Sequence, residues 1–421
     1  MVLYLLDFKF GGPIEPELFW DREKEVGFLI DRLSKIKAGV KHNYALVGPR
    51  RMGKSSILGF IEPKLARKGI VPVFIDCEGR EFASQAELSL ELLLNSWGNS
   101  VLDAFFEHAG LANKIKVKLR DFIVGTKDKI ISALSEALGR LRALEMKTAS
   151  SYLELRLEFE KATSVRAPSP KELMKMLDDT LDLAERLGEE RDRYFVLMLD
   201  EFQNVSKFRK PIDFLPAFRR HMQAQRRVAY LLTGSNIGMM ELLLQRPFGG
   251  HIPLEWIGTF ERGVAKDFLK ERFEALGRGI DDRAIGEIVD FTGGHPAYLN
   301  WFGERCCREV PAGGKITVEL VQEFEEKIFE REGLMHVFEE DLSRVSPKRG
   351  KMYSTFIEMA GHDLESPSKI SKFVPRSTPS EIILYLRRLE QRGFVRKQAR
   401  GRYLIVDDML KRYIKRKIHS T

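Results

Sequence analysis

The 421-residue chain has only three cysteines, Cys77 and the adjacent pair Cys306 and Cys307. An odd number of cysteines with no repeated spacing does not form the disulfide framework of a small secreted domain. The histidines and cysteines also lack the paired spacing of a structural zinc site. We therefore expect a protein of a reducing, cytoplasmic compartment that folds without disulfides or structural zinc.

Long hydrophobic runs are missing as well. No window approaches the roughly 18 uninterrupted apolar residues of a membrane-spanning helix. The apolar start of the chain is followed by Asp7 and Lys9 and lacks the basic residues of a signal peptide. We expect no membrane insertion. With 43% hydrophobic residues the chain can bury substantial cores, which excludes disorder as its general state.

The positive charge is unevenly distributed. The whole chain has a formal net charge of +8, but residues 344–421 carry 19 basic and 7 acidic side chains, a surplus of 12. The remaining 50 basic and 54 acidic side chains leave residues 1–343 at −4. A solvated surface can hold such a surplus without function, and it can also mark the binding site of an acidic partner.

Short apolar runs, separated by segments with helical periodicity, predict the strands of a parallel sheet. They lie at residues 43–47, 71–75, 194–199, 227–232 and 252–257. Such a sheet is covered by helices on both faces and binds ligands at the carboxyl ends of its strands. Functional residues are therefore expected directly after these runs.

A P-loop motif follows the first run and precedes a helical stretch. It consists of Gly48, Pro49, Arg50, Arg51, Met52, Gly53, Lys54, Ser55 and Ser56. In this motif the glycines let backbone N–H groups turn toward phosphates, and Lys54 reaches the β- and γ-phosphates. The hydroxyl of Ser55 would ligate Mg²⁺. An ordinary glycine turn is the alternative, but the strand before the motif and the helix after it favour a P-loop.

Two adjacent acids, Asp200 and Glu201, follow the third run. Asp200 is predicted to hold Mg²⁺, mostly through the water shell of the ion, and Glu201 to orient or deprotonate the attacking water. A helix N-cap is the alternative for a strand that ends in acids. The second acid favours hydrolysis over binding alone.

The loop after the fourth run provides further catalytic candidates. Ser235 and Asn236 could each contact the γ-phosphate or the lytic water, and we predict Asn236 as the catalytic residue of the two, with a simple turn role as the alternative. The charge of the transition state usually needs an additional cation. The candidates, acting in cis or in trans, are Arg219, Arg220 and Arg246.

The basic C-terminal segment has the pattern of a winged helix-turn-helix. Thr378 to Glu381 form a capping box with proline at the first helical position, and Gly393 ends the helix. Two short strands then flank the turn Ala399-Arg400-Gly401. The helix and the hairpin carry the predicted DNA-binding residues Arg387, Arg388, Arg392, Arg400 and Arg402, which would reach a major groove and adjacent phosphates. Winged helices also bind proteins, so a protein partner stays open.

Residues 18–310 resemble the archaeal ATPases of the AAA+/STAND group. The resemblance rests on five motifs in order: Trp20 to Glu25, the P-loop, Leu197 to Gln203, Thr233 to Ser235, and Thr292 to Pro296. It implies an ASCE-type core in which Ser235 or Asn236 is a sensor residue. It also implies that Arg22 lies near the adenine end of the nucleotide and that Pro296, in a Gly-x-Pro motif, closes over the base.

The predicted fold class is α/β, with a parallel-sheet P-loop core of the ASCE/AAA+ type at residues 1–258. This core would carry a helical insertion at about 80–190, followed by a helical lid at 259–343 and the winged helix at 344–421. The predicted function is an Mg²⁺-dependent ATPase that cycles between ATP and ADP and acts as a switch, associated with double-stranded DNA. The alternatives are a DNA-binding transcription or replication regulator licensed by ATP, and a signalling scaffold that recruits a protein partner or forms homo-oligomers.

Overall fold

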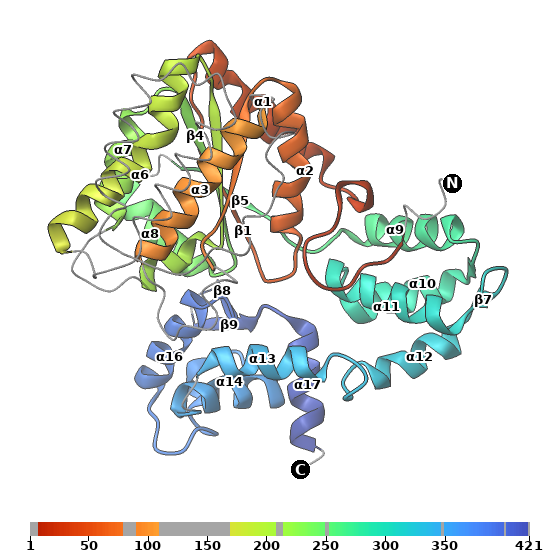
Figure 1. Ribbon diagram of the computed structural model, residues 1–421. Coiled ribbons are helices and arrows are strands. Elements are labelled where there is room, and N and C mark those ends of the chain that lie inside the picture. The colour runs from red at the N-terminus through yellow and green to blue at the C-terminus, as the bar shows by residue number, and fades with distance from the viewer. Residues whose placement is uncertain are drawn as a thin grey trace.

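The computed structural model describes residues 7–78, 90–108, 169–207, 214–248, 252–346, 349–399 and 401–419. A lobe built on a sheet lies above a second, mainly helical lobe (Figure 1). None of the helices within these described ranges is both apolar and long enough to cross a bilayer. Most of the predicted helical insertion falls at 109–168, outside the described residues.

The first lobe contains the predicted parallel sheet. Its strands, in spatial order, are β2 (Val71–Asp76), β3 (Phe195–Asp200), β4 (Val228–Gly234), β1 (Tyr44–Val47) and β5 (Leu254–Trp256). All neighbouring strands pair in parallel. The predicted sheet is thereby confirmed. Because β4 lies between β1 and β3, the loop after β4 lies next to both the P-loop and the two acids.

Helices cover both faces of this sheet because alternate strand residues point to opposite sides. Val196 and Met198 of β3 pack with α1 (Glu23–Ser34) and α2 (Lys54–Arg67). Leu197 and Leu199 of β3 face the other layer. That layer consists of α3 (Leu90–His108), α6 (Pro170–Arg191), α7 (Phe214–Ala224) and α8 (Ile237–Phe248). Short 3-10 turns lie at Pro16–Leu18, Lys35–Ala38 and Phe202–Lys207.

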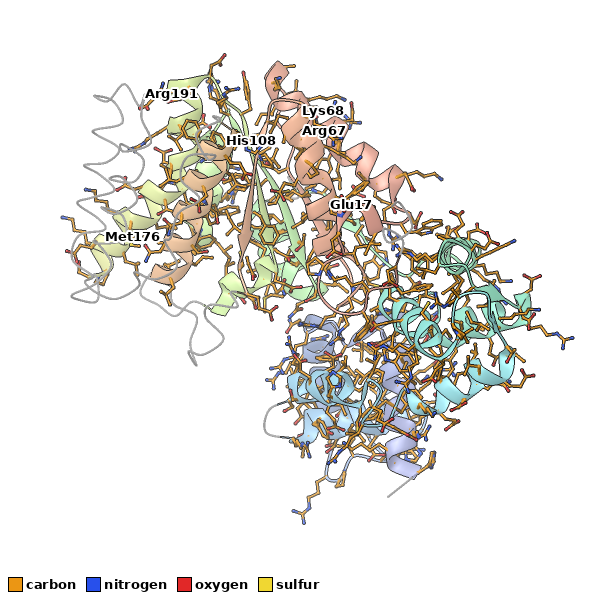
Figure 2. The ribbon with its side chains drawn as sticks, turned by 45° about the vertical axis from the view of Figure 1, so that its right-hand side comes forward. Glu17, Arg67, Lys68, His108, Met176 and Arg191 are labelled. Atoms are coloured by element: carbon orange, nitrogen blue, oxygen red, sulfur yellow. The ribbon has the colours of Figure 1, made fainter. Side chains whose placement is uncertain are left out.

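The direction of the covering helices places their N-termini near the second lobe. Arg67, Lys68, His108 and Arg191, at the C-terminal ends of α2, α3 and α6, lie at the end of the first lobe that faces away from the second lobe (Figure 2). The positive N-terminal end of α2, directly after the P-loop, therefore points toward the junction between the lobes. An anion is favoured at such a helix end.

The second lobe begins with five helices, α9 (Arg262–Ala275), α10 (Asp282–Thr292), α11 (Pro296–Glu309), α12 (Val318–Lys327) and α13 (Met335–Val345). The two-residue strands β6 (Gly279–Ile280) and β7 (Lys315–Ile316) pair beside them. We call residues 259–345 the lid.

The C-terminal segment then has the order expected of a winged helix. It consists of α14 (Lys351–Gly361), α15 (Pro367–Ile370), α16 (Pro379–Gln391), the antiparallel strands β8 (Val395–Ala399) and β9 (Arg402–Ile405), and α17 (Asp408–His419). The capping box of Thr378 and Glu381 is present at the start of α16. Buried residues of the lid and of this C-terminal segment form one contiguous hydrophobic cluster, which Phe8 also joins.

The C-terminal segment touches the first lobe at the loop after β4. A Cβ atom on Gly238, in α8, would lie 2.7 Å from the Cα atom of Gln391 at the end of α16. Gly393 has a φ of +78°, and a Cβ there would lie 2.8 Å from the carbonyl oxygen of Ser235. Only glycine allows backbones to approach this closely. The end of α16 is thus packed against the Ser235 loop.

Candidate functional site

A cavity of about 770 Å³ lies at the carboxyl edge of the sheet, where the two lobes meet. The P-loop, Asp200 and Glu201 line one part of it, and Arg22, Phe260 and Pro296 line another. Arg344 reaches it from the last turn of α13 in the lid. The structure therefore brings together residues from the first lobe, from the lid and from the start of the chain.

Two residues of the P-loop have a left-handed backbone, and a third closely approaches the end of a neighbouring strand. Gly53 has a φ of +86° and Arg51 a φ of +60°. A Cβ atom on Gly48 would overlap the carbonyl oxygen of Ile257. The ammonium of Lys54 donates to the carbonyl oxygens of Gly48, at 3.0 Å, and Pro49, at 2.7 Å. Burial lowers the pKa of Lys54 to about 8, although Glu201 and Asp200 oppose the shift.

Asp200 lies between two hydroxyl groups. The hydroxyl of Ser55 donates to one of its carboxylate oxygens at 2.6 Å, and that of Thr233 donates to the other. Burial raises the pKa of Asp200 despite these two hydrogen bonds. A cation beside Asp200 would offset the cost of burying its charge. Hydroxyl and carboxylate oxygens are ligands that Mg²⁺ prefers, so the residues fit this metal.

Glu201 is held in place by its neighbours. It adopts a left-handed backbone with a φ of +51°, which a residue with a side chain rarely does. Its carboxylate accepts hydrogen bonds from the hydroxyl of Ser235, at 2.7 Å, and from the side-chain amide of Gln203. Burial would raise the pKa of Glu201, but the charge of Lys54 and these two hydrogen bonds outweigh it and the pKa falls. An ionised, oriented carboxylate can accept a proton from water.

The structure separates the two candidates of the loop after β4. Ser235 contacts Glu201, as described above. The side-chain oxygen of Asn236 instead accepts a hydrogen bond from the backbone N–H of Met239, at 3.1 Å, in the first turn of α8. Gln203 was not singled out from the sequence, because a glutamine two residues after an acid has no motif of its own.

Arg22 and Pro296 line the same cavity, together with Phe260, although they are far apart in the sequence. The guanidinium of Arg22 lies 5.3 Å from the centre of the Phe260 ring and donates to the carbonyl oxygen of Gly258. Pro296 is the first residue of α11. Gly294 before it has a φ of +71°, and a Cβ atom there would overlap the carbonyl oxygen of Phe260. The Gly-x-Pro loop is therefore fitted closely against the backbone of Phe260.

The start of the chain is a part of the site that sequence reasoning missed. The segment 9–14 lines the cavity. The backbone N–H of Ile14 donates to the hydroxyl of Ser56 at 3.2 Å, and that of Lys9 donates to the side-chain oxygen of Asn300, in α11, at 3.1 Å. This segment therefore joins the P-loop helix to the lid. The turn-forming residues Gly11-Gly12-Pro13 predict a loop, but they do not indicate that this loop contacts the P-loop helix and the lid.

Two of the three predicted additional cations, Arg219 and Arg220, lie elsewhere. Arg220 is paired with Asp178 of α6, 2.5 Å away. Among the described residues, neither Arg219 nor Arg220 lines the cavity. The side chain of Arg246 lies outside the described part of the structure. Arg344, which sequence reasoning also missed, does line the cavity.

The predicted DNA-binding arginines have different surroundings. Arg387 and Arg388 are exposed on α16. Arg392 donates to the backbone carbonyl oxygens of Val345, at 2.8 Å, and Arg344, at 3.2 Å. Arg402 forms an ion pair with Glu365, and Arg400 lies outside the described residues. Arg392 and Arg402 are exposed as well, but their guanidinium groups have partners within the chain.

Comparisons with known proteins agree with this geometry. Residues 19–302 match the family model of an ATPase domain predominantly from Archaea. The Walker-type ATPase of Pyrococcus abyssi is similar in structure, with a TM-score of 0.64, 19% identity, and coverage of 97% of this chain and 99% of the other. The ORC2 protein of Aeropyrum pernix, solved with ADPNP and ADP, gives a TM-score of 0.50, 13% identity and coverage of 97% and 96%. At these identities the two structures show a common fold. No curated protein matches the chain in sequence.

Proposed function

The chain belongs to the family of ATPase domains found predominantly in Archaea, and on this premise we propose that it is a nucleotide-driven switch whose C-terminal segment responds to the state of the P-loop site. The family and the fold make it an ATP-hydrolysing P-loop enzyme. The proposal adds three points. They are the roles of single residues, the use of Mg²⁺, and the output through the C-terminal segment.

In the proposed reaction, the P-loop backbone from Gly48 to Ser56 and the ammonium of Lys54 bind the phosphates. Ser55 and Asp200 would hold Mg²⁺, which when bound supplies positive charge beside the phosphates. Glu201 accepts a proton from the attacking water, and Ser235 and Gln203 keep its carboxylate in position.

The remaining predicted site residues surround this centre. Arg22 and Pro296 would enclose the adenine end. This is consistent with their place in the lining of the same cavity, which Phe260 also lines. Asn236 would act from the same loop as Ser235. Arg50 and Met52 line the cavity as parts of the P-loop.

One observation carries the switch proposal: Ser235 contacts both the catalytic carboxylate and the C-terminal segment. Its hydroxyl donates to Glu201 at 2.7 Å, and its carbonyl oxygen lies against Gly393, at the end of α16. A change at Glu201 on hydrolysis would therefore reach α16 through a single residue. A second link runs from Arg51 of the P-loop to Asp341 of α13, 2.6 Å apart. Two links that start from neighbouring loops of the sheet lobe can bias a common conformational change.

Double-stranded DNA is the partner we propose for the C-terminal segment. Arg387 and Arg388 are adjacent on the exposed face of α16, where a recognition helix would carry its phosphate and base contacts. The net surplus of 12 positive charges over residues 344–421 supports this choice. Leu384, 47% exposed, and Phe373, 44% exposed, lie in the same segment and would suit a protein partner instead. A signalling scaffold or a homo-oligomer is therefore the competing function.

A salt titration of DNA binding tests this choice. For the double variant Arg387→Ala/Arg388→Ala we expect weaker binding to duplex DNA and a slope of log K against log salt that is smaller by about two, since each lost phosphate contact removes about one. The control is Arg262→Ala/Arg308→Ala, which removes two exposed arginines of the lid. Fluorescence anisotropy at several salt concentrations measures the affinity and the salt slope for each variant. If the affinity for duplex DNA did not change with salt, DNA would be rejected as the partner, and a protein partner would remain as the alternative.

A further inference from the structure

The chemistry of this site requires positive charge at the terminal phosphate beyond that of the P-loop. In phosphoryl transfer, negative charge spreads over the oxygens of the transferred group, and an arginine that contacts them lowers the barrier. The cavity edge is also rich in acids, because Asp76 and Glu78 at the end of β2 line it together with Asp200 and Glu201. A bound triphosphate would face all four carboxyl groups.

Most cations that line the cavity are already engaged. Arg22 donates to the carbonyl oxygen of Gly258, and Arg51 is paired with the buried Asp341. Lys9 has an exposed ion pair with Glu15 and lies in the segment at the start of the chain, not in the lid. Lys54 and Arg50 belong to the P-loop itself. Arg344 is the cavity-lining cation that comes from the last turn of α13 in the lid.

Arg344 is held by contacts that it can exchange. Its guanidinium lies 2.5 Å from the Glu340 carboxylate and 3.6 Å from that of Glu78, and its side chain is 36% exposed. Partly exposed ion pairs of this kind contribute little to stability, because water screens them. A phosphate oxygen accepts stronger, charge-assisted hydrogen bonds from a guanidinium than a neutral acceptor does, and a phosphate group can bind two N–H groups at once. The contact with Glu78 already places the guanidinium on the acidic side of the cavity.

We propose that Arg344 is a catalytic residue that contacts the terminal phosphate of ATP in cis. During hydrolysis the bond from the water oxygen to the terminal phosphorus forms, and the bond from that phosphorus to the bridging oxygen breaks. The electron pair of the broken bond stays with ADP, and the proton of the water goes to Glu201. Arg344 gives and takes no proton, and it stabilises the charge of the transferred group. The proposal rests on the ATPase activity and is independent of DNA binding.

The same turn of α13 is bound to α16. The backbone carbonyl oxygens of Arg344 and Val345 accept hydrogen bonds from the guanidinium of Arg392. A movement of Arg344 toward or away from the phosphate would therefore displace the acceptors of Arg392. This gives the lid its own route from the nucleotide to the C-terminal segment.

The test compares Arg344→Ala and Arg344→Lys with the wild type and with Arg308→Ala. Arg308 is a suitable control because, like Arg344, it pairs with a glutamate four residues earlier, but it lies on α11 away from the cavity. Steady-state hydrolysis gives kcat, and titration with fluorescent ATP and ADP analogues gives both affinities. The turnover of the wild type is measured first, so that a failure of the ATPase assignment is distinguished from a failure of the Arg344 role.

For Arg344→Ala we expect kcat to fall about 100-fold, the ADP affinity to stay within about threefold, and the preference for ATP over ADP to decrease. Arg344→Lys keeps the positive charge but cannot donate two parallel hydrogen bonds. We expect its kcat to be about tenfold higher than that of Arg344→Ala. Arg308→Ala should equal the wild type. The proposal is overturned if Arg344→Ala turns over within about threefold of the wild type, or if the ATP and ADP affinities fall together with the melting temperature.

Discussion

The Glu201→Gln variant is expected to bind ATP as the wild type does and to hydrolyse it about 1,000-fold more slowly, in the range of losses that follow removal of a general base. Glutamine has nearly the same shape as glutamate and can still accept a hydrogen bond from Ser235. It cannot take a proton from water near neutral pH. Binding therefore survives because Lys54, Ser55 and Asp200 are untouched, whereas the proton acceptor is lost.

Two measurements check this expectation. Isothermal titration calorimetry with ATP gives the affinity, and a phosphate-release assay gives kcat. Glu189→Gln, an exposed position on α6, serves as the control and should behave as the wild type. Turnover by Glu201→Gln at the wild-type rate would show that another group accepts the proton.

Replacement of Lys54 has the largest expected effect on binding. We expect the ammonium of Lys54 to make two charge-assisted contacts to phosphates, at about 2 kcal/mol each. Because Lys54→Ala removes both contacts, the Kd for ATP should rise roughly 1,000-fold. Burial lowers the pKa of Lys54 to about 8, because the two carbonyl oxygens and the nearby carboxylates only partly compensate the buried ammonium. The free variant should therefore be at least as stable as the wild type.

Thermal unfolding separates these two effects. The wild type should melt at a higher temperature with saturating ATP, since a ligand that binds only the folded state stabilises it. Lys54→Ala should lose this rise while it keeps the melting temperature of the free protein. Lys68→Ala, at the far end of the same helix (Figure 2), should keep both. An unchanged ATP-dependent rise in Lys54→Ala would contradict the assigned role of Lys54.

The sheet and the centre of the site could be predicted from the sequence because both depend on local patterns. Continuous apolar runs identify buried parallel strands, and the carboxyl ends of such strands meet at one edge. The P-loop motif and the pair Asp200 and Glu201 are therefore expected at the same edge from their positions after these runs. The structure brings the hydroxyl of Ser55 to 2.6 Å from Asp200, as that arrangement requires.

The parts that could not be predicted depend on packing between distant segments. Arg344 reaches the cavity only because the lid brings the last turn of α13 to it, and no motif surrounds it. Arg392 has the spacing of a DNA-contacting residue, but its guanidinium is hydrogen-bonded to the end of α13. The choice between Ser235 and Asn236 depends on which of two neighbouring side chains turns toward Glu201. Sequence spacing does not contain that information.

These contacts indicate how the site could control the C-terminal segment. The Ser235 loop and the carbonyl oxygens that bind Arg392 contact the end of α16, and the Arg51–Asp341 pair joins the P-loop to α13. Figure 1 shows α13 and α16 in the part of the molecule that lies below the sheet. In the proposed switch, a change of the nucleotide would reach the C-terminal segment through these contacts.

The central claim is that the state of the nucleotide moves the C-terminal segment relative to the sheet lobe. It is tested most directly by a distance measurement between spin labels at Glu190→Cys, on α6, and Gln398→Cys, on β8, both of which are exposed positions. Cys307 is first replaced by serine because it is only partly buried and would also react with the label, whereas Cys77 and Cys306 are buried. In the Glu201→Gln background, we predict different distance distributions with saturating ATP and with ADP. The same distribution in both states would contradict the account.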